Sequence, residues 1–202
     1  SESGNHDVAI IPIDLASLKS VRAFAEEILK REEPVALLMN NSGIMEQQGR
    51  TITEDGMERT VQVNYAGHYL LSRLLVPKME RGSRIVSMTS LTYRWGRIDF
   101  PTFFDSGCRG SYWRIFPYFN SKLAITLFTI KLAKELKDKG IMVNCADPGI
   151  VATDIIYFKM WFDSLTRVLF APYIRTPRQG AATAIRLLLS KDVEGQTGTF
   201  NL

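Results

Sequence analysis

The sequence predicts an α/β protein built around a parallel sheet. Short apolar runs alternate with longer segments in which apolar residues recur at helical spacing. Polar or glycine-containing clusters follow several of the short runs, where a strand would end. The chain has 202 residues, of which 46% are hydrophobic, so we expect one domain over residues 1–202.

The first half of the chain is expected to contain three strands and two helices. Residues 8–13, 35–39 and 84–88 are short apolar runs that end next to polar residues, as buried strands do. Residues 18–28 place apolar side chains three to four positions apart, which predicts a helix. A second, longer helix is expected over residues 54–79.

The second half continues the alternation. A strongly apolar helix is expected over residues 118–136, closed by Gly140, since glycine commonly follows the end of a helix. Residues 142–146 form a fourth apolar run, and residues 176–190 have helical spacing. A final strand is expected to begin within residues 199–202.

The predicted strands end in residues that are suited to ligand binding. These are Asp14, residues 40–43, Thr89 and Ser90, and Pro148 and Gly149. In open α/β sheets, ligands bind outside the carboxyl ends of the strands. We therefore expect these residues to converge on one edge of the sheet.

Tyr118 and Lys122 form the most informative pair. They are four positions apart at the start of a predicted helix, so they share one of its faces. A cation beside a phenol favours the phenolate and lowers a pKa that is ordinarily about 10. Such a tyrosine can exchange a proton with an alcohol or a carbonyl near neutral pH. The pair alone is a weak signal, and its value depends on the surrounding motifs.

Composition excludes several classes of protein. The formal charge of +4 comes from scattered lysines and arginines, which argues against a nucleic-acid surface. The two cysteines, Cys108 and Cys145, offer neither a disulfide framework nor metal-ligand spacing, so no metal is expected. The first residues do not resemble a signal peptide, and no apolar stretch is long enough to span a membrane. We expect a cytoplasmic location, or one on the surface of an intracellular membrane.

Several ordered motifs resemble those of the short-chain dehydrogenase/reductase family, in its retinol-dehydrogenase-like branch. They are Asp14-Leu15, Asn40-Asn41-Ser42-Gly43, Val63-Asn64-Tyr65-Ala66-Gly67-His68, Ser90, Tyr118-x-x-x-Lys122 and Pro148-Gly149-x-Val151-x-Thr153. They follow the family order over nearly the whole chain. The resemblance implies a Rossmann-like, doubly wound parallel sheet with helices on both faces, N-terminally incomplete in this chain.

The resemblance implies roles for four catalytic residues. Tyr118 would be the general acid in carbonyl reduction and the general base in alcohol oxidation, and Lys122 would bind the nicotinamide ribose. Ser90 would donate a hydrogen bond to the substrate oxygen; Ser87 is a rival that strand alternation places on the opposite face, and Thr89 is interpreted as structural. Asn64 would hold a water that links the lysine to solvent, or would instead bond to backbone. His68 is interpreted as a packing residue.

Further residues would contact NADP or NAD, with NADP favoured by family analogy. They are Asp14, Asn41, Ser42, Gly43, Tyr118, Lys122, Pro148, Gly149 and Thr153. Ser42 stands where the family usually has alanine. Asp14 would lie near the adenine or would simply cap the next helix, and the Pro148-Gly149 segment would contact the nicotinamide or form an ordinary turn.

The family's glycine-rich phosphate loop, T-G-x-x-x-G-x-G, does not occur in this sequence. Two explanations remain open. The chain is part of a longer oxidoreductase, or it is a non-catalytic binding or regulatory fragment that holds cofactor poorly. A sugar-nucleotide epimerase also uses a Tyr-x-x-x-Lys pair, but the Pro148-Gly149 motif weighs against it.

Two aromatic-rich segments are expected on the substrate side, at about 91–117 and 153–175. The first lies between Ser90 and Tyr118 and favours a hydrophobic substrate, retinoid-, steroid- or lipid-like, or else it covers the core. The second has charges every four residues and a broad apolar face over 155–174, which could close a pocket or contact a membrane surface. A homo-oligomer is a further expectation.

Overall fold

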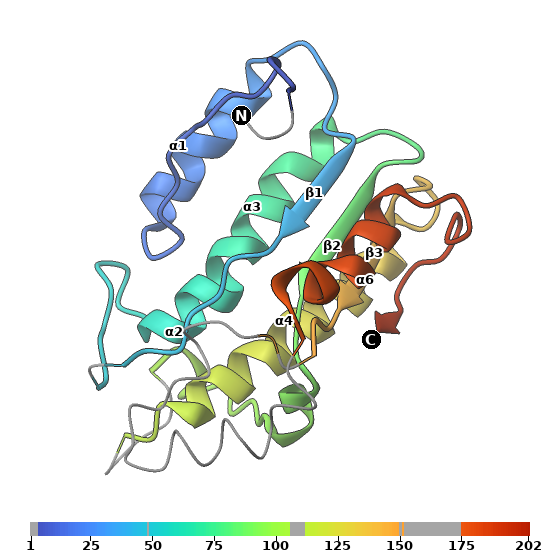
Figure 1. Cartoon of the computed structure of the whole chain (residues 1–202). Helices are drawn as coiled ribbons and strands as arrows, with labels where there is room; N and C mark the ends of the chain where they lie inside the picture. The colour runs from blue at the N-terminus through green and yellow to red at the C-terminus, as the bar shows by residue number, and fades with distance from the viewer. Residues whose placement is uncertain (1–3, 48, 106–111, 150, 152–174) are drawn as a thin grey trace.

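A computed structural model describes residues 4–47, 49–105, 112–149, 151 and 175–202. These residues form a four-stranded parallel sheet that carries helices on both faces (Figure 1). The strands are β1 (Leu37–Asn40), β2 (Arg84–Met88), β3 (Met142–Ala146) and β4 (Phe200–Asn201). The α/β fold class and the parallel sheet predicted from the sequence are confirmed.

The strands lie side by side in chain order, β1-β2-β3-β4. Asn40 pairs with Ser87, and Met88 pairs with Ala146, so the carboxyl ends of the first three strands finish close together. The segments that leave these strands therefore start from one edge of the sheet, where α/β proteins place their ligands.

Helices cover the two faces unequally. The helical elements are α1 (Leu18–Leu29), α2 (Arg59–Val61), the π-helical turn η1 (Gln62–Ala66), α3 (Gly67–Leu75), the 3-10 turns η2 (Val76–Lys78), η3 (Leu91–Trp95) and η4 (Phe103–Asp105), α4 (Ile115–Leu136) and α6 (Pro177–Leu189). Helices α3 and α4 cover one face of the sheet, α1 packs against α3, and α6 covers the opposite face (Figure 1).

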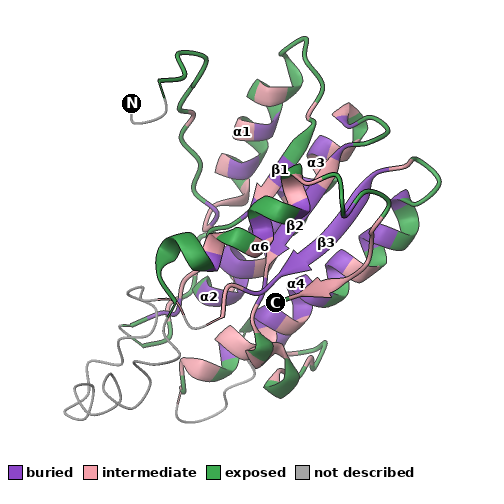
Figure 2. Ribbon diagram, turned by 45° about the vertical axis from the view of Figure 1, so that its right-hand side comes forward, coloured by how far each residue is buried: buried purple, intermediate pink, exposed green. Residues whose placement is uncertain are grey.

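The two central strands, β2 and β3, are buried on both sides (Figure 2). Ile85 and Val143 belong to the larger apolar cluster beneath α3 and α4, whereas Val86 and Ala146 belong to the smaller cluster beneath α6. This alternation follows from the two-residue period of a strand. It explains why these strands read as continuous apolar runs.

The predicted strand at residues 8–13 is wrong. The segment has no regular secondary structure, and Val8 and Ile10 are 63% and 92% exposed. A strand needs a neighbour whose backbone completes its hydrogen bonds, and no strand among the described residues pairs with this segment. The apolar run at residues 8–13 was therefore not sufficient evidence for a strand.

Other boundaries moved less. The long helix expected at 54–79 begins only at Arg59, because residues 53–56 form a turn in which Gly56 has a positive φ of 76°. Helix α4 begins at Ile115, three residues before Tyr118. The final strand is limited to Phe200–Asn201.

Candidate active site

Four segments bring the predicted catalytic residues together at the carboxyl edge of the sheet. Ser90 follows β2, Tyr118 and Lys122 lie in the first two turns of α4, and Asn64 lies in the π-helical turn η1. Gly43, after β1, closes the group, since a Cβ at this position would stand 3.4 Å from both Lys122 Nζ and Asn64 Oδ1.

The side chain of Tyr118 is partly buried, and its pKa is raised to about 12. Burial is the largest cause, and the carboxylate of Asp147 adds to it, while a hydrogen bond from Ser90 acts in the opposite direction. The expectation of a lowered pKa is therefore wrong for this arrangement. Tyr118 is a protonated acid across the physiological range.

Lys122 explains why the expected lowering is absent. Its Nζ lies 5.5 Å from the centre of the Tyr118 ring and donates to the carbonyl of Met88 at 3.1 Å. The ammonium is buried, which lowers the pKa of Lys122 to about 8; Asp147 and Cys145 limit the lowering. Lys122 thus remains charged at neutral pH and loses its charge in mildly alkaline solution.

Asn64 ties the loop after β1 to the catalytic helix. Its Oδ1 accepts from Ile44 N at 2.8 Å, and its Nδ2 donates to Ile44 O at 2.9 Å and to Ser121 Oγ at 3.1 Å. Ser121 Oγ donates in turn to the carbonyl of Tyr118 at 2.7 Å. Both amide hydrogens of Asn64 are thus bonded to protein atoms. This agrees with the alternative that Asn64 bonds to backbone, and the backbone in question is that of the loop after β1.

His68 anchors the same loop one turn further along. Its Nε2 lies 2.8 Å from the carbonyl of Ser42, which can only accept, so Nε2 carries the proton. Burial lowers the pKa of His68 to about 4, more than the bond to Ser42 raises it, and Lys122 contributes to the lowering. Sequence reasoning missed this anchoring role, although the spacing of four residues from Asn64 placed both side chains on one face.

The residues around Ser90 have hydrogen-bond partners of their own. Ser87 is buried and accepts from Asn40 Nδ2 at 3.2 Å; the same Nδ2 donates to Ser72 of α3, so Ser87 lies on the face of β2 that α3 and α4 cover. Thr89 Oγ1 donates to the carbonyl of Lys122 at 3.2 Å and so joins the end of β2 to α4. Ser90 Oγ accepts from Thr92 N at 3.3 Å, which caps the turn η3.

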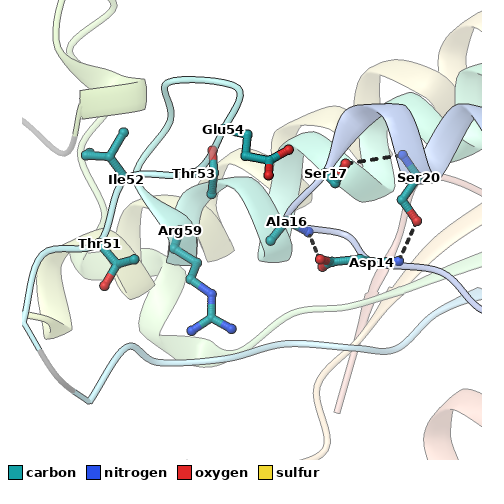
Figure 3. A pocket seen from close by; sticks show the side chains of 9 residues that line it. All are labelled: Asp14, Ala16, Ser17, Ser20, Thr51, Ile52, Thr53, Glu54 and Arg59. Carbon is teal, nitrogen blue, oxygen red and sulfur yellow. Dashed lines mark hydrogen bonds between the residues drawn. The ribbon is translucent and has the colours of Figure 1, made fainter.

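Asp14 lies at the amino end of α1, beside an open hollow of about 470 Å³ (Figure 3). Its carboxylate accepts from Ala16 N at 2.8 Å, whereas the cap of α1 is Ser17, whose Oγ accepts from Ser20 N at 3.3 Å. The alternative that Asp14 is the helix cap is therefore wrong. Arg59 and Glu54 lie on the other side of the hollow.

The loop after β3 also reaches the site. Gly149 has a positive φ of 71°, which completes the predicted turn after Pro148. Asp147, to which no motif gave a role, is 2% exposed and acts on both Tyr118 and Lys122. Thr153 and residues 155–174 lie outside the described residues.

A parallel sheet with helices on both faces and a polar site at its carboxyl edge is the arrangement of dinucleotide-binding α/β proteins. The chain belongs to the short chain dehydrogenase family, whose model matches residues 1–103 and 106–159. The family resemblance drawn from the motifs is thereby confirmed.

Known proteins support this membership. Retinol dehydrogenase 14 of Mus musculus is 40% identical over 193 residues, covering 93% of this chain and 57% of the relative. Polyprenol dehydrogenase of Mus musculus is 36% identical over 209 residues, covering 99% and 61%. A crystal structure of a blue fluorescent protein from a metagenomic library, in complex with NADPH, is 25% identical with a TM-score of 0.68, over 94% of this chain and 71% of that one.

The chain therefore spans about three fifths of the length of the curated relatives that it matches. Among its described residues, no helix is both long and apolar enough to cross a membrane.

Proposed function

We propose that the protein transfers a hydride between NAD(P)(H) and an alcohol or carbonyl group of a hydrophobic molecule. The observation that carries the proposal is the convergence of Ser90, Tyr118, Lys122 and Asn64 at the carboxyl edge of the sheet. Family membership supports the same reaction class. A bound nicotinamide would supply or accept the hydride, and the chain would handle the proton.

The residues fit the ribose and nicotinamide half of such a cofactor. Gly43 presents bare backbone beside the ammonium of Lys122, so a ribose could approach without meeting a side chain. Asn41 and Ser42 are exposed on the same loop, and Pro148 and Gly149 flank the site from β3. Asp14 is proposed to lie near the adenine, and Thr153 is proposed to contact the nicotinamide end.

The protonation state of the site suits carbonyl reduction. With a pKa of about 12, Tyr118 holds a proton that it can donate to the oxygen of a carbonyl at neutral pH. Ser90 would donate a second hydrogen bond to that oxygen, where negative charge develops during hydride transfer. Lys122, still charged below pH of about 8, would bind the cofactor ribose.

Exposed aromatic side chains around the N-terminal end of α4 support a hydrophobic substrate. Trp95, Trp113 and Phe116 are 65%, 64% and 51% exposed, and Trp95 packs on Phe119, one residue after Tyr118. The two relatives named above are a retinol and a polyprenol dehydrogenase, which suggests an isoprenoid or similarly lipophilic alcohol or aldehyde. Residues 91–117 and 153–175 are proposed as substrate-side segments, and contact of 155–174 with a membrane surface remains a prediction, as does a homo-oligomer.

Replacing Tyr118 by phenylalanine tests the proposal, because it removes only the hydroxyl. In the complete protein, reduction of a lipophilic aldehyde with NADPH should fall by about 10³-fold or more, while NADPH affinity stays within a few-fold. Phe119→Leu, next to the site but without a proton to give, is the matched control and should retain turnover within about tenfold. Turnover of Tyr118→Phe at the wild-type rate would contradict the assignment.

The alternative, a non-catalytic fragment that holds cofactor poorly, is less well supported. Membership of an oxidoreductase family favours catalysis over binding alone, and the hydrogen bonds among Asn64, Ser121 and Ile44 hold the proposed catalytic groups in place. A titration of this 202-residue chain with NADPH, followed by fluorescence, separates the two functions, because tight, saturable binding counts against the alternative.

A further inference from the structure

Asp147 is a buried carboxylate at the end of β3, and its backbone is fixed from both sides. Thr89 N donates to the carbonyl of Ala146 at 2.9 Å, and Asp147 N donates to the carbonyl of Asn201 at 2.8 Å. The residue therefore extends the sheet ladder by one position, and its side chain starts from a rigid point at the carboxyl edge.

The two oxygens of Asp147 reach into two different loops. Oδ1 accepts from Gly149 N at 2.7 Å, which closes the turn after β3. Oδ2 accepts from the backbone N–H of Leu91, the residue that directly follows Ser90. A local turn would require only the first bond; the second crosses 56 residues of sequence and connects two walls of the site.

We propose that Asp147 is a positioning residue, which holds the turn carrying Ser90 against the loop of Pro148 and Gly149 and sets the charge around the proton-transfer pair. The role rests on the proposed function above. Ser90 must place its hydroxyl to within a fraction of an ångström to stabilise a developing oxyanion. The carboxylate of Asp147 supplies that placement, because it accepts from the N–H of Leu91, the residue after Ser90, and is itself held by Gly149 N.

The charge of Asp147 faces the site, and no ion pair joins it to another of the described residues. It raises the pKa of both Tyr118 and Lys122, so it keeps a proton on each group. The other groups that face the pair are Ser90 from the end of β2, Cys145 from β3 and His68 from α3. Of these, Asp147 is the one that acts on both members of the pair.

The first test measures positioning without relying on activity. Asp147→Asn can still accept from Gly149 but presents an NH₂ group to Leu91 N–H, and Asp147→Ala loses both bonds. Hydrogen–deuterium exchange of residues 89–95 should accelerate in both variants. Asp192→Asn, the same chemical change in an exposed carboxylate paired with Arg186, should leave exchange there unchanged. If Asp147→Ala does not fold, Asp147→Asn alone decides, and unchanged exchange in it overturns the proposal.

The second test measures how the charge acts. For Asp147→Asn, kcat for carbonyl reduction should fall by about 10- to 100-fold, with KM for the carbonyl substrate little changed. The alkaline limb of the pH profile, which follows loss of the Lys122 proton, should move to lower pH because a charge that favours protonation is gone. A profile or kcat equal to that of wild type overturns the proposal, even if exchange is faster. Failure of Tyr118→Phe to lose activity would instead overturn the proposed reaction and leave the exchange result standing.

Discussion

The ammonium of Lys122 lies over the face of the Tyr118 ring, 5.5 Å from its centre, and bonds to the carbonyl of Met88. The two side chains share a face of α4, as their spacing predicted, but the pKa of Tyr118 is set by burial, Asp147 and Ser90 rather than by Lys122. Helical spacing fixes which side of the helix a residue occupies, whereas the direction of a long side chain depends on which acceptor lies nearby. Here the acceptor is the last carbonyl of β2.

Lys122→Met should stabilise the protein while removing its activity. Burying the ammonium lowers its pKa from 10.5 to about 8, which corresponds to roughly 3 kcal/mol of folding free energy. Loss of the bond to Met88 offsets about 1 kcal/mol, so we expect a net gain of about 2 kcal/mol at pH 7 in urea unfolding. Such a gain is typical when a polar catalytic side chain is replaced.

The stability difference between Lys122→Met and wild type should depend on pH. Because the folded-state pKa of Lys122 is below the unfolded value, the unfolded chain binds the proton more tightly, and wild-type stability rises between about pH 8 and 10.5. The advantage of Lys122→Met should therefore shrink over that range. Lys131→Met, an exposed lysine on the same helix, should change stability by less than about 0.5 kcal/mol. If Lys122→Met were less stable than wild type at pH 7, burial of the ammonium would not be destabilising the folded protein.

His68→Gln should remove an acid sensitivity of the fold. The pKa of buried His68 is about 4 against an ordinary 6.5, so the folded protein loses about 2 kcal/mol as pH falls from 6.5 to 5. Glutamine can still donate an N–H to Ser42 but does not titrate, so the variant should lose little over that window in chemical unfolding. His6→Gln, at the exposed second histidine, should behave as wild type does. Equal acid sensitivity of wild type and His68→Gln would disprove the assignment.

Gly96→Ala should displace the first substrate-side segment. A Cβ at this position would lie 2.6 Å from the carbonyl of Phe119 and 2.8 Å from Leu123 Cβ, so η3 must move away from α4. We expect a loss of about 1–3 kcal/mol in stability and a rise in substrate KM at saturating cofactor.

Gly67→Ala is the matched control for this substitution. Its Cβ would lie 2.9 Å from the carbonyl of Leu15, in the turn that precedes α1 and away from the substrate segment. It should lose stability but leave substrate KM unchanged. An equal change of KM in both variants would mean that residues 91–117 do not shape the substrate side.

The sequence predicted the elements whose pattern is set by burial. Strands β2 and β3 occur at the expected residues because both of their faces are covered, which leaves an unambiguous apolar run. The segment at 8–13 has a similar composition but no partner strand among the described residues, and composition cannot report on a partner. The ends of helices moved where a local turn, such as that at Gly56, competed with the helix.

The candidate site was predicted as a set of positions but not as a network. Motif order located Ser90, Tyr118 and Lys122, and the parallel sheet explains why they meet. The acceptor of Lys122, the two-sided bond of Asn64 with Ile44 and the reach of Asp147 to Leu91 depend on distances between segments 20 to 56 residues apart. Periodicity within one segment carries no information on such distances.

The π-helical turn at Gln62–Ala66 has a consequence for how this fold tolerates change in length. A π turn holds one residue more than an α turn, and each residue of a regular helix rotates the following side chains by about 100°. The amide of Asn64 faces α4, whereas Leu71 and Leu75, further along the same continuous helix, face the core. The wider π turn allows both sets of side chains to point in these directions. Deleting one residue there would give a more regular helix and would turn the amide of Asn64 away from Ser121, so the irregularity itself sets the geometry of the site.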